Sequence, residues 1–131
     1  MNILVTGGAG FIGSHIVNTY IKAGHRVTVI DNLSSGKLRF LNPEVNFYEM
    51  DILDSEVSEI LKSEKIETIN HHAAQISVSE SVADPLFDVN SNIIGTLQLL
   101  QSAVSFGVSK FIFASTGGGM YGEQIFFPAS E

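Results

Sequence analysis

The chain has 131 residues, of which 44% are hydrophobic and 16% charged, and its formal net charge is −7. This length and composition are typical of one globular domain with its own core and exclude a disordered chain. The acidic balance argues against non-specific binding to nucleic acid or anionic membranes, and no apolar stretch is long enough to cross a bilayer. The absence of cysteine excludes disulfides and thiolate metal sites and is compatible with a cytoplasmic protein.

The first fifteen residues predict a strand, a glycine-rich turn and a helix. Residues 3–5 are an uncharged apolar run, as in a strand buried on both faces. The glycines that follow favour a tight turn with positive φ. With glycine at 7, 10 and 13, the turn backbone can approach a diphosphate, and the N–H groups of the helix start would point at it. The alternative is an ordinary tight turn between a strand and a helix.

A second strand is predicted at residues 26–30, and Asp31 follows it, 18 positions after Gly13. A carboxylate at about this offset accepts hydrogen bonds from the adenine ribose hydroxyls of a dinucleotide and repels a 2′-phosphate. The sequence therefore favours NAD over NADP. A turn or helix cap is the alternative role for Asp31. Residues 32–37 are expected to form a loop.

Residues 45–50 predict a third strand, with Asp51 and Ile52 directly after it. An acidic and an apolar residue at this place could hold the adenine amino group and ring. The alternative is a loop carboxylate that caps the next helix, which is expected from Asp54 to about Lys62, with Val57, Ile60 and Leu61 facing inward.

Residues 66–70 predict a fourth strand, which is followed by two histidines and two alanines at 71–74. Small residues at the carboxyl end of a strand allow a cofactor to lie against the backbone. We expect no metal site, because neighbouring strand residues point to opposite faces and no acidic or histidine partner stands at ligand spacing.

A long helix is predicted from Pro85 to the stop at Gly107, with Asp84 as its cap. Its apolar residues recur at spacings of three and four and are expected to form core or a subunit interface. They are Leu86, Val89, Ile93, Leu97, Leu100 and Val104. Asn92 and Gly95 interrupt this pattern, and a cofactor or strand ends passing close by would explain both.

Residues 110–114 predict a fifth strand, and Ser115 and Thr116 follow it. Hydroxyls at this place, beside a cofactor, are candidates for holding a reacting hydroxyl, and a flexible turn is the alternative. Residues 123–131 are expected to form a loop. The alternation of strands and helices predicts an α/β fold with an open parallel sheet, since each crossover is right-handed and lays its helix on one face.

These motifs resemble those of the extended short-chain dehydrogenases/reductases, and within that family most closely those of UDP-glucose 4-epimerases and related nucleotide-sugar epimerases and dehydratases. The matching segments run in order through the chain, at residues 6–13, 31–33, 51–52, 71–74, 92–96 and 110–122. The resemblance implies a Rossmann-like, doubly wound parallel sheet over residues 1–131, with five strands in the order 3-2-1-4-5 and NAD across their carboxyl ends.

The resemblance also implies which residues bind the cofactor. It places the turn of residues 7–13 at the diphosphate, Asp31 at the adenine ribose, residues 51–52 at the adenine, and Ala73, Ala74 and Asn92 along the diphosphate and nicotinamide ribose. The implied cofactor residues are Gly7, Gly10, Phe11, Ile12, Gly13, Asp31, Asn32, Ser35, Asp51, Ile52, Ala73, Ala74 and Asn92. Thr116 matches the catalytic Ser/Thr of the family, which hydrogen-bonds the sugar hydroxyl that is oxidised.

The main departure of the chain from the family pattern concerns the catalytic base. The family's base is a Tyr followed four positions later by Lys, and no tyrosine in this chain has that partner; Tyr121 belongs to a preceding Tyr-Gly motif. We therefore expect an N-terminal NAD-binding portion that is inactive alone and meets a nucleotide sugar only when completed. The alternatives are a regulatory module that senses NAD, part of a nucleotide-sugar dehydratase or reductase, and a fragment completed by another chain. An unpaired sheet edge is expected to favour homo-oligomers.

Overall fold

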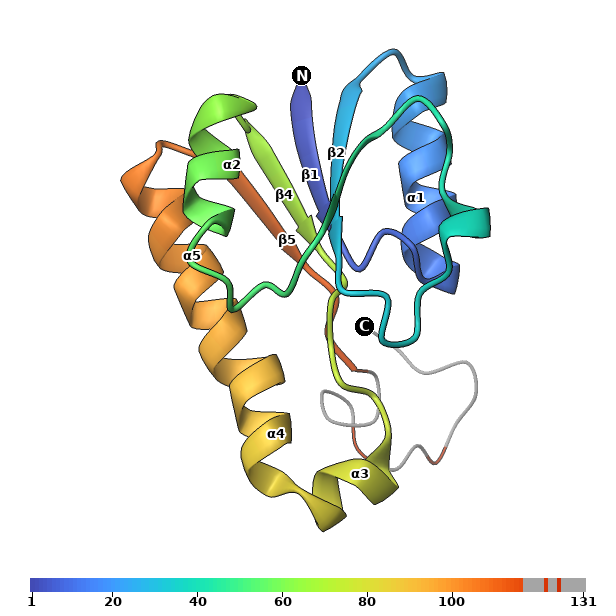
Figure 1. Cartoon of the computed structure of the whole chain (residues 1–131), viewed down its shortest axis with the longest axis vertical. Coiled ribbons are helices and arrows are strands. Elements are labelled where there is room, and N and C mark those ends of the chain that lie inside the picture. Colours follow the sequence, from blue (N-terminus) through green and yellow to red (C-terminus); the bar gives the residue numbers. More distant parts are fainter. Residues whose placement is uncertain (117–121, 123–124, 126–131) are drawn as a thin grey trace.

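The computed structural model describes residues 1–116, 122 and 125, and its five parallel strands form one sheet (Figure 1). The strands lie in the order β3-β2-β1-β4-β5, which confirms the expected order. Their bounds are β1 Asn2–Thr6, β2 Arg26–Asp31, β3 Asn46–Glu49, β4 Thr68–His71 and β5 Lys110–Phe113. Tyr121 and almost all of the loop expected at 123–131 lie outside the described residues.

Helices cover both faces of the sheet. Their bounds are α1 Phe11–Lys22, α2 Val57–Ser63, α3 Val78–Ala83, α4 Pro85–Val89 and α5 Gly95–Ser105, with a 3₁₀ turn at Leu38–Phe40 and a π-helical turn, η2, at Asn90–Ile94. Helix α1 lies on one face, and α2 and α5 lie on the other (Figure 1). This arrangement is the doubly wound α/β architecture that the sequence predicts.

The alternation of side chains along β1 divides the core into two layers. Ile3 and Val5 pack with Val17 of α1, whereas Leu4 packs on the other side with Leu61 of α2 and Leu99 of α5. Successive strand residues point to opposite faces, so an uninterrupted apolar run is required where both faces are covered. The interpretation of residues 3–5 as a doubly buried strand is confirmed.

The long helix expected between β4 and β5 is present as an unbroken helical segment from Pro85 to Ser105. Asp84 caps it as predicted, accepting a 3.0 Å hydrogen bond from the N–H of Phe87. What the sequence did not predict is the π-helical turn within it, between α4 and α5. A further helix, α3, precedes them; its cap is Ser77, whose hydroxyl accepts a 3.3 Å hydrogen bond from the N–H of Glu80. The six residues of α3 are too few to produce a clear periodic pattern.

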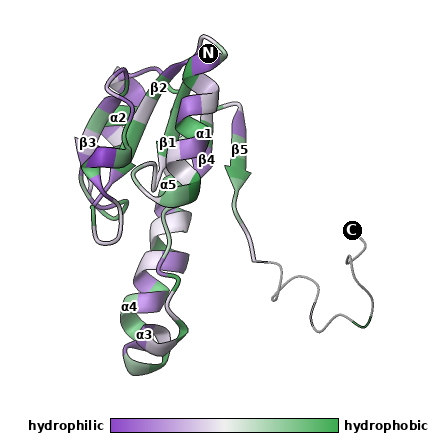
Figure 2. Ribbon diagram, turned by 90° about the vertical axis from the view of Figure 1, so that its right-hand side faces the viewer, coloured by the Kyte–Doolittle hydropathy of each residue, from purple (hydrophilic) through white to green (hydrophobic). Residues whose placement is uncertain are grey.

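The apolar stripe of this helical segment is not in the core, so that part of the expectation is wrong. Leu97 is 51% exposed and Val104 is 82% exposed. Helix α5 instead buries Gly95, Leu99 and Ala103, which are spaced by four and include two small residues that allow close approach. The α3–α4 end extends beyond the carboxyl edge of the sheet, as Figure 2 shows. A subunit interface along the stripe remains a prediction.

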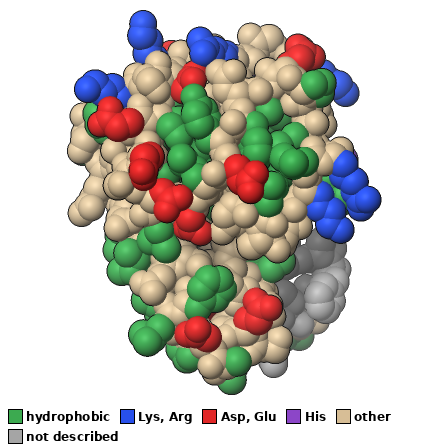
Figure 3. Space-filling view, in the orientation of Figure 1, with side chains coloured by type: hydrophobic (Ala, Val, Ile, Leu, Met, Phe, Trp, Pro, Cys, Tyr) green, Lys and Arg blue, Asp and Glu red, His purple; other side chains and the backbone are tan. Residues whose placement is uncertain are grey.

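Figure 3 shows how charged side chains are distributed on one face of the molecule. Acidic side chains are scattered from the top to the bottom of this face, whereas Lys and Arg lie along its upper edge and margins. Within the part of the chain that the structure describes, no helix combines the length and apolar character needed to cross a membrane.

Candidate cofactor-binding site

A cavity of about 680 Å³ lies along the carboxyl ends of the strands. Its lining comes from the glycine turn after β1, the loops after β2 and β3, the segment after β4, and the residues that follow β5. All the predicted cofactor residues except Asn92 are in this lining. Open parallel sheets bind their ligands in this position, outside the carboxyl ends of the strands.

The glycine turn makes two close approaches within the protein that require glycine. Gly7 has φ +67°, and a Cβ built on it would lie 2.7 Å from the backbone nitrogen of Ala73. A Cβ on Gly13 would collide with the carbonyl oxygen of Gly7. Gly10, by contrast, has φ −75° and is the residue that precedes α1. The expectation of positive φ is therefore confirmed at Gly7 and wrong for Gly10, where the absence of a side chain matters for space rather than for backbone conformation.

The Asp31 carboxylate lies at the end of β2 and is only 7% exposed. Its Oδ2 accepts a 2.9 Å hydrogen bond from the N–H of Ala9, and its Oδ1 accepts one of 2.8 Å from the N–H of Leu33. The turn-capping role, which the sequence left as an alternative, is thus present. An ionised carboxylate has about four acceptor positions, so capacity for ribose hydroxyls remains.

The side chains of Asn32 and Asp51 join the loops after β2 and β3. Asn32 Nδ2 donates a 2.7 Å hydrogen bond to Asp51 Oδ2, and Asp51 Oδ1 accepts from the N–H of Leu53 at 3.0 Å. Asp51 therefore organises its own loop, but it does not cap the next helix, because the N-cap of α2 is Glu56; the helix-capping alternative is wrong. A contact of Asp51 with adenine stays a prediction.

The presence of glycine at position 95, inside a helix, is explained by its contact with Ile52. A Cβ on Gly95 would lie 2.6 Å from Ile52 Cδ1, so the isoleucine side chain occupies the space that any larger residue on α5 would need. The sequence suggested that a cofactor or strand ends pass close to Gly95. The structure shows that the close neighbour is a side chain that also lines the cavity.

The two histidines after β4 have different surroundings. His71 is 2% exposed and lies between Thr6 and Thr96, whereas His72 lines the cavity and its Nε2 is 2.8 Å from Asn70 Oδ1. Burial, and to a lesser extent the neighbouring His72, lowers the pKa of His71 to about 4; burial also lowers the pKa of His72. Among the described residues, no group of three or more His, Cys, Asp or Glu is arranged to hold a metal ion.

Asn92 does not line the cavity but holds a segment that does. Its Oδ1 accepts a 2.8 Å hydrogen bond from the N–H of Gln75, and its Nδ2 donates to the Gln75 carbonyl at 2.9 Å and to Asp88 Oδ1 at 3.0 Å. The presence of a polar residue near the apolar stripe is therefore explained by its hydrogen bonds to the backbone of Gln75, in the segment after β4. A direct contact with the nicotinamide ribose remains a prediction.

Sequence reasoning missed several residues of the lining. They are Ile30, Ser34, Met50, His72, Gln75, Ile76, Ser77, Glu80, Phe87, Ser91 and Ala114. Position at a strand end could have indicated Met50 and His72, whereas Ser77 and Glu80 depend on α3, which was not predicted. Thr116 is exposed and is not in the lining, although its neighbour Ser115 is.

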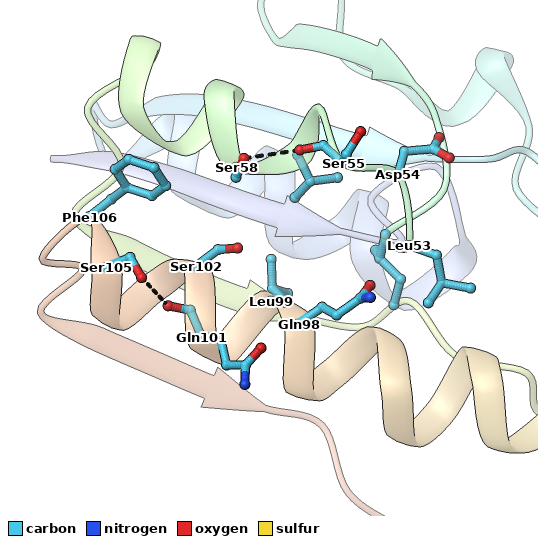
Figure 4. Close-up of a pocket in the computed structure, with 12 residues that line it drawn as sticks. Leu53, Asp54, Ser55, Ser58, Gln98, Leu99, Gln101, Ser102, Ser105 and Phe106 are labelled. Carbon is cyan, nitrogen blue, oxygen red and sulfur yellow. Dashed lines mark hydrogen bonds between the residues drawn. The ribbon is translucent and has the colours of Figure 1, made fainter.

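A second hollow, of about 380 Å³, lies between α2 and α5 (Figure 4). Its hydroxyls are largely used within their own segments: Ser58 donates to the Ser55 carbonyl and Ser105 donates to the Gln101 carbonyl, both at 2.9 Å. Because the polar residues of its lining are serines and glutamines apart from Asp54, this hollow indicates no particular class of ligand.

The sheet order, the glycine turn and the cavity at the strand ends define a Rossmann-type dinucleotide-binding fold. Comparison with known families makes the assignment specific. Residues 3–131 match the NAD dependent epimerase/dehydratase family, and the chain belongs to this family.

Similar proteins are UDP-glucose 4-epimerases. The one from Mycolicibacterium smegmatis is 43% identical over 136 residues, and the match covers 100% of this chain and 44% of that protein. A Klebsiella pneumoniae sequence is 40% identical over 139 residues, and the match covers 100% of this chain and 99% of that sequence. The Thermotoga maritima enzyme with UDP-glucose has a TM-score of 0.90 and 53% identity, covering 96% of this chain and 41% of that chain. The Thermus thermophilus enzyme with NAD has a TM-score of 0.92 and 44% identity, and the match covers 100% of this chain and 42% of that chain. The chain thus spans about two fifths of most of these relatives.

Proposed function

We propose that this chain is the NAD-binding part of a nucleotide-sugar epimerase of the UDP-glucose 4-epimerase type. The observation that carries the proposal is the order of groups along the cavity. Asp51 and Ile52 lie after β3, Asp31 after β2, the glycine turn after the central β1, and the segment of residues 72–77 after β4. This lateral order matches adenine, ribose, diphosphate and nicotinamide in a bound dinucleotide. The NAD in the Thermus thermophilus relative supports the same cofactor.

The residues present fit NAD. Gly10 keeps the turn free of a side chain, and the one atom near an added Cβ is the Gly7 carbonyl oxygen at 3.2 Å. The N–H groups at the start of α1 would hold the diphosphate. Asp31 would accept the ribose hydroxyls. When bound, NAD would supply the hydride acceptor for transient oxidation of a sugar hydroxyl, and the protein would position the reacting groups.

The chain's own contribution to proton transfer is small. Thr116, after β5, would hydrogen-bond the sugar hydroxyl. A base is needed to remove the hydroxyl proton, and free tyrosine ionises only near pH 10, so a lysine partner is required for it to act near neutrality. The 131 residues hold no tyrosine with a lysine four positions later. We therefore expect this chain to bind NAD without interconverting UDP-glucose and UDP-galactose.

Calorimetric titration with NAD tests the binding part of the proposal. Saturable binding by the folded chain is expected, and its absence in a chain with an intact circular dichroism spectrum would refute the NAD site. A chimera tests the catalytic part: residues 1–131 replace the corresponding segment of the Thermotoga maritima enzyme, which is 53% identical over the matched region. Epimerase activity of the chimera, with none from the isolated chain, is the expected result. A chimera that binds NAD but is inactive would contradict the epimerase assignment.

A further inference from the structure

A buried chain of hydrogen bonds connects the end of β1 with helix α5. Thr6 Oγ1 lies 2.6 Å from His71 Nδ1, and His71 Nε2 lies 2.9 Å from Thr96 Oγ1. Thr6 is fully buried and His71 nearly so, and neither side chain is in the cavity lining. These groups therefore cannot serve as direct ligands of a molecule in the cavity.

The donor and acceptor of each hydrogen bond in this series are determined by the other bonds that the same groups make. Thr6 Oγ1 accepts from the backbone N–H groups of His72 and Ala73, both at 3.2 Å. A hydroxyl has two acceptor positions and one proton, so Thr6 donates its proton to His71 Nδ1. The ring proton is then on Nε2 and is donated to Thr96 Oγ1, which donates in turn to the Asn92 carbonyl at 2.9 Å. Only the neutral Nε2–H form of His71 satisfies all of these bonds.

Both ends of this hydrogen-bond series hold the segment after β4. Thr6 holds this segment at Ala73, and the Asn92 amide holds it at Gln75 through both the N–H and the carbonyl. His71 and Thr96 join these two anchors through the sheet. The segment between them lines the cavity and lies against Gly7, where an added Cβ would be 2.7 Å from the Ala73 nitrogen.

We infer that His71 is a positioning residue of the cofactor site, whose neutral ring links Thr6 to Thr96 and so holds residues 72–75 in the conformation that accepts the dinucleotide. The inference rests on the proposed function for the identity of the ligand. It assigns to His71 no contact with cofactor or substrate, because the ring acts through the Thr6 hydroxyl and the backbone that this hydroxyl holds.

Matched substitutions of the two threonines provide the test. Thr6→Val and Thr96→Val remove a hydroxyl with almost no change of shape, and Thr6→Ser and Thr96→Ser keep it. In calorimetric titrations of the 131-residue chain, each Val variant should bind NAD about five- to tenfold more weakly, the range expected for one buried hydrogen bond, and each Ser variant should bind nearly as the parent does. In a His71→Phe background, Thr96→Val should have no further effect on NAD affinity.

Amide hydrogen exchange without NAD separates this inference from the proposed function. The amide of Ala73 should exchange several-fold faster in Thr6→Val and His71→Phe than in the parent. The amide of His72, which also donates to the Thr6 carbonyl at 3.1 Å, and the amides of β2 should change little. Unchanged exchange at Ala73, or Val variants that bind NAD as the parent does, would overturn the inference. If the parent itself does not bind NAD, the proposed function fails, and the exchange data still decide whether His71 holds this segment.

Discussion

The backbone N–H of Ala9 donates a 2.9 Å hydrogen bond to the carboxylate of Asp31, joining the turn after β1 to the end of β2. The same carboxylate accepts from the N–H of Leu33 at 2.8 Å, so a single anion organises two walls of the cavity. Gly36 also lies against it, because a Cβ there would be 2.7 Å from Asp31 Oδ1. The residue that is proposed to read the ribose is therefore also part of the scaffold that holds the glycine turn.

This dual role determines how cofactor preference should be tested. The chain should bind NAD at least about tenfold more tightly than NADP, equivalent to roughly 1.4 kcal/mol, because Asp31 would repel a 2′-phosphate. Asp31→Ala should weaken both complexes through loss of the bonds to Ala9 and Leu33, and should also narrow the ratio of the two affinities. The ratio from parallel titrations is the informative quantity. Equal affinities in the parent would show that Asp31 does not face the 2′ position.

A substitution at Gly10 should affect NAD binding far more than folding. Its φ of −75° is compatible with any residue, and an added Cβ would lie 3.2 Å from the Gly7 carbonyl oxygen, so Gly10→Val should fold with some loss of stability, while its side chain blocks the diphosphate position and abolishes NAD binding. Gly24→Ala is the converse control. Gly24 has φ +78° and open space around it, so this variant should lose about 1 kcal/mol of stability and bind NAD normally. Urea denaturation and NAD titration of both variants check this pair; a Gly10→Val chain that still binds NAD would contradict the assignment of the turn.

Acid should destabilise the chain through His71. Its pKa is about 4 in the folded chain and about 6.5 when unfolded, so below pH 6.5 the unfolded state takes up a proton that the folded state does not. The free energy of unfolding should therefore fall between pH 6.5 and 4, by roughly 3 kcal/mol from this group. Urea denaturation at successive pH values measures the slope. His71→Phe should be less stable at pH 7 but should show a smaller slope in this range; an unchanged slope would mean that His71 is not the group responsible.

The exposed apolar stripe on the helical segment should cause self-association. Exposed apolar patches of this kind mark contact surfaces, and within the described residues β5 pairs only with β4. We expect dimers or larger species in light scattering. Leu97→Glu, at a position that is 51% exposed, should shift the distribution toward monomer, whereas Gln101→Glu at an exposed polar position of the same helix should not. A parent chain that stays monomeric at high concentration would contradict the prediction.

The strands and the cavity could be predicted from the sequence because their signals are local. The apolar run at residues 3–5, the glycines and the strand-end acids each carry their meaning within a few positions. The network around His71 could not be predicted in this way. Its partners Thr6 and Thr96 are 65 and 25 positions away in the chain, and threonine on a strand or helix carries no signal of its own.

Helical spacing alone was also insufficient to identify the buried face of α5. The larger apolar residues at Leu97 and Leu100 suggest one face, but the helix buries Gly95, Leu99 and Ala103 instead. Two of these three are small residues, which contribute little to a hydrophobic pattern. For the same reason the role of Gly95 became clear only with the position of Ile52.

The contact between Gly95 and Ile52 has an evolutionary consequence. Because a Cβ at position 95 would lie 2.6 Å from Ile52 Cδ1, enlarging residue 95 would require a smaller residue at 52 or a shift of the Ile52 side chain, which lines the cavity. Positions 52 and 95 should therefore covary among homologues. A homologue with alanine at the position of Gly95 should carry valine or a smaller residue at the position of Ile52, and its ancestor should have passed through the smaller residue at 52 first.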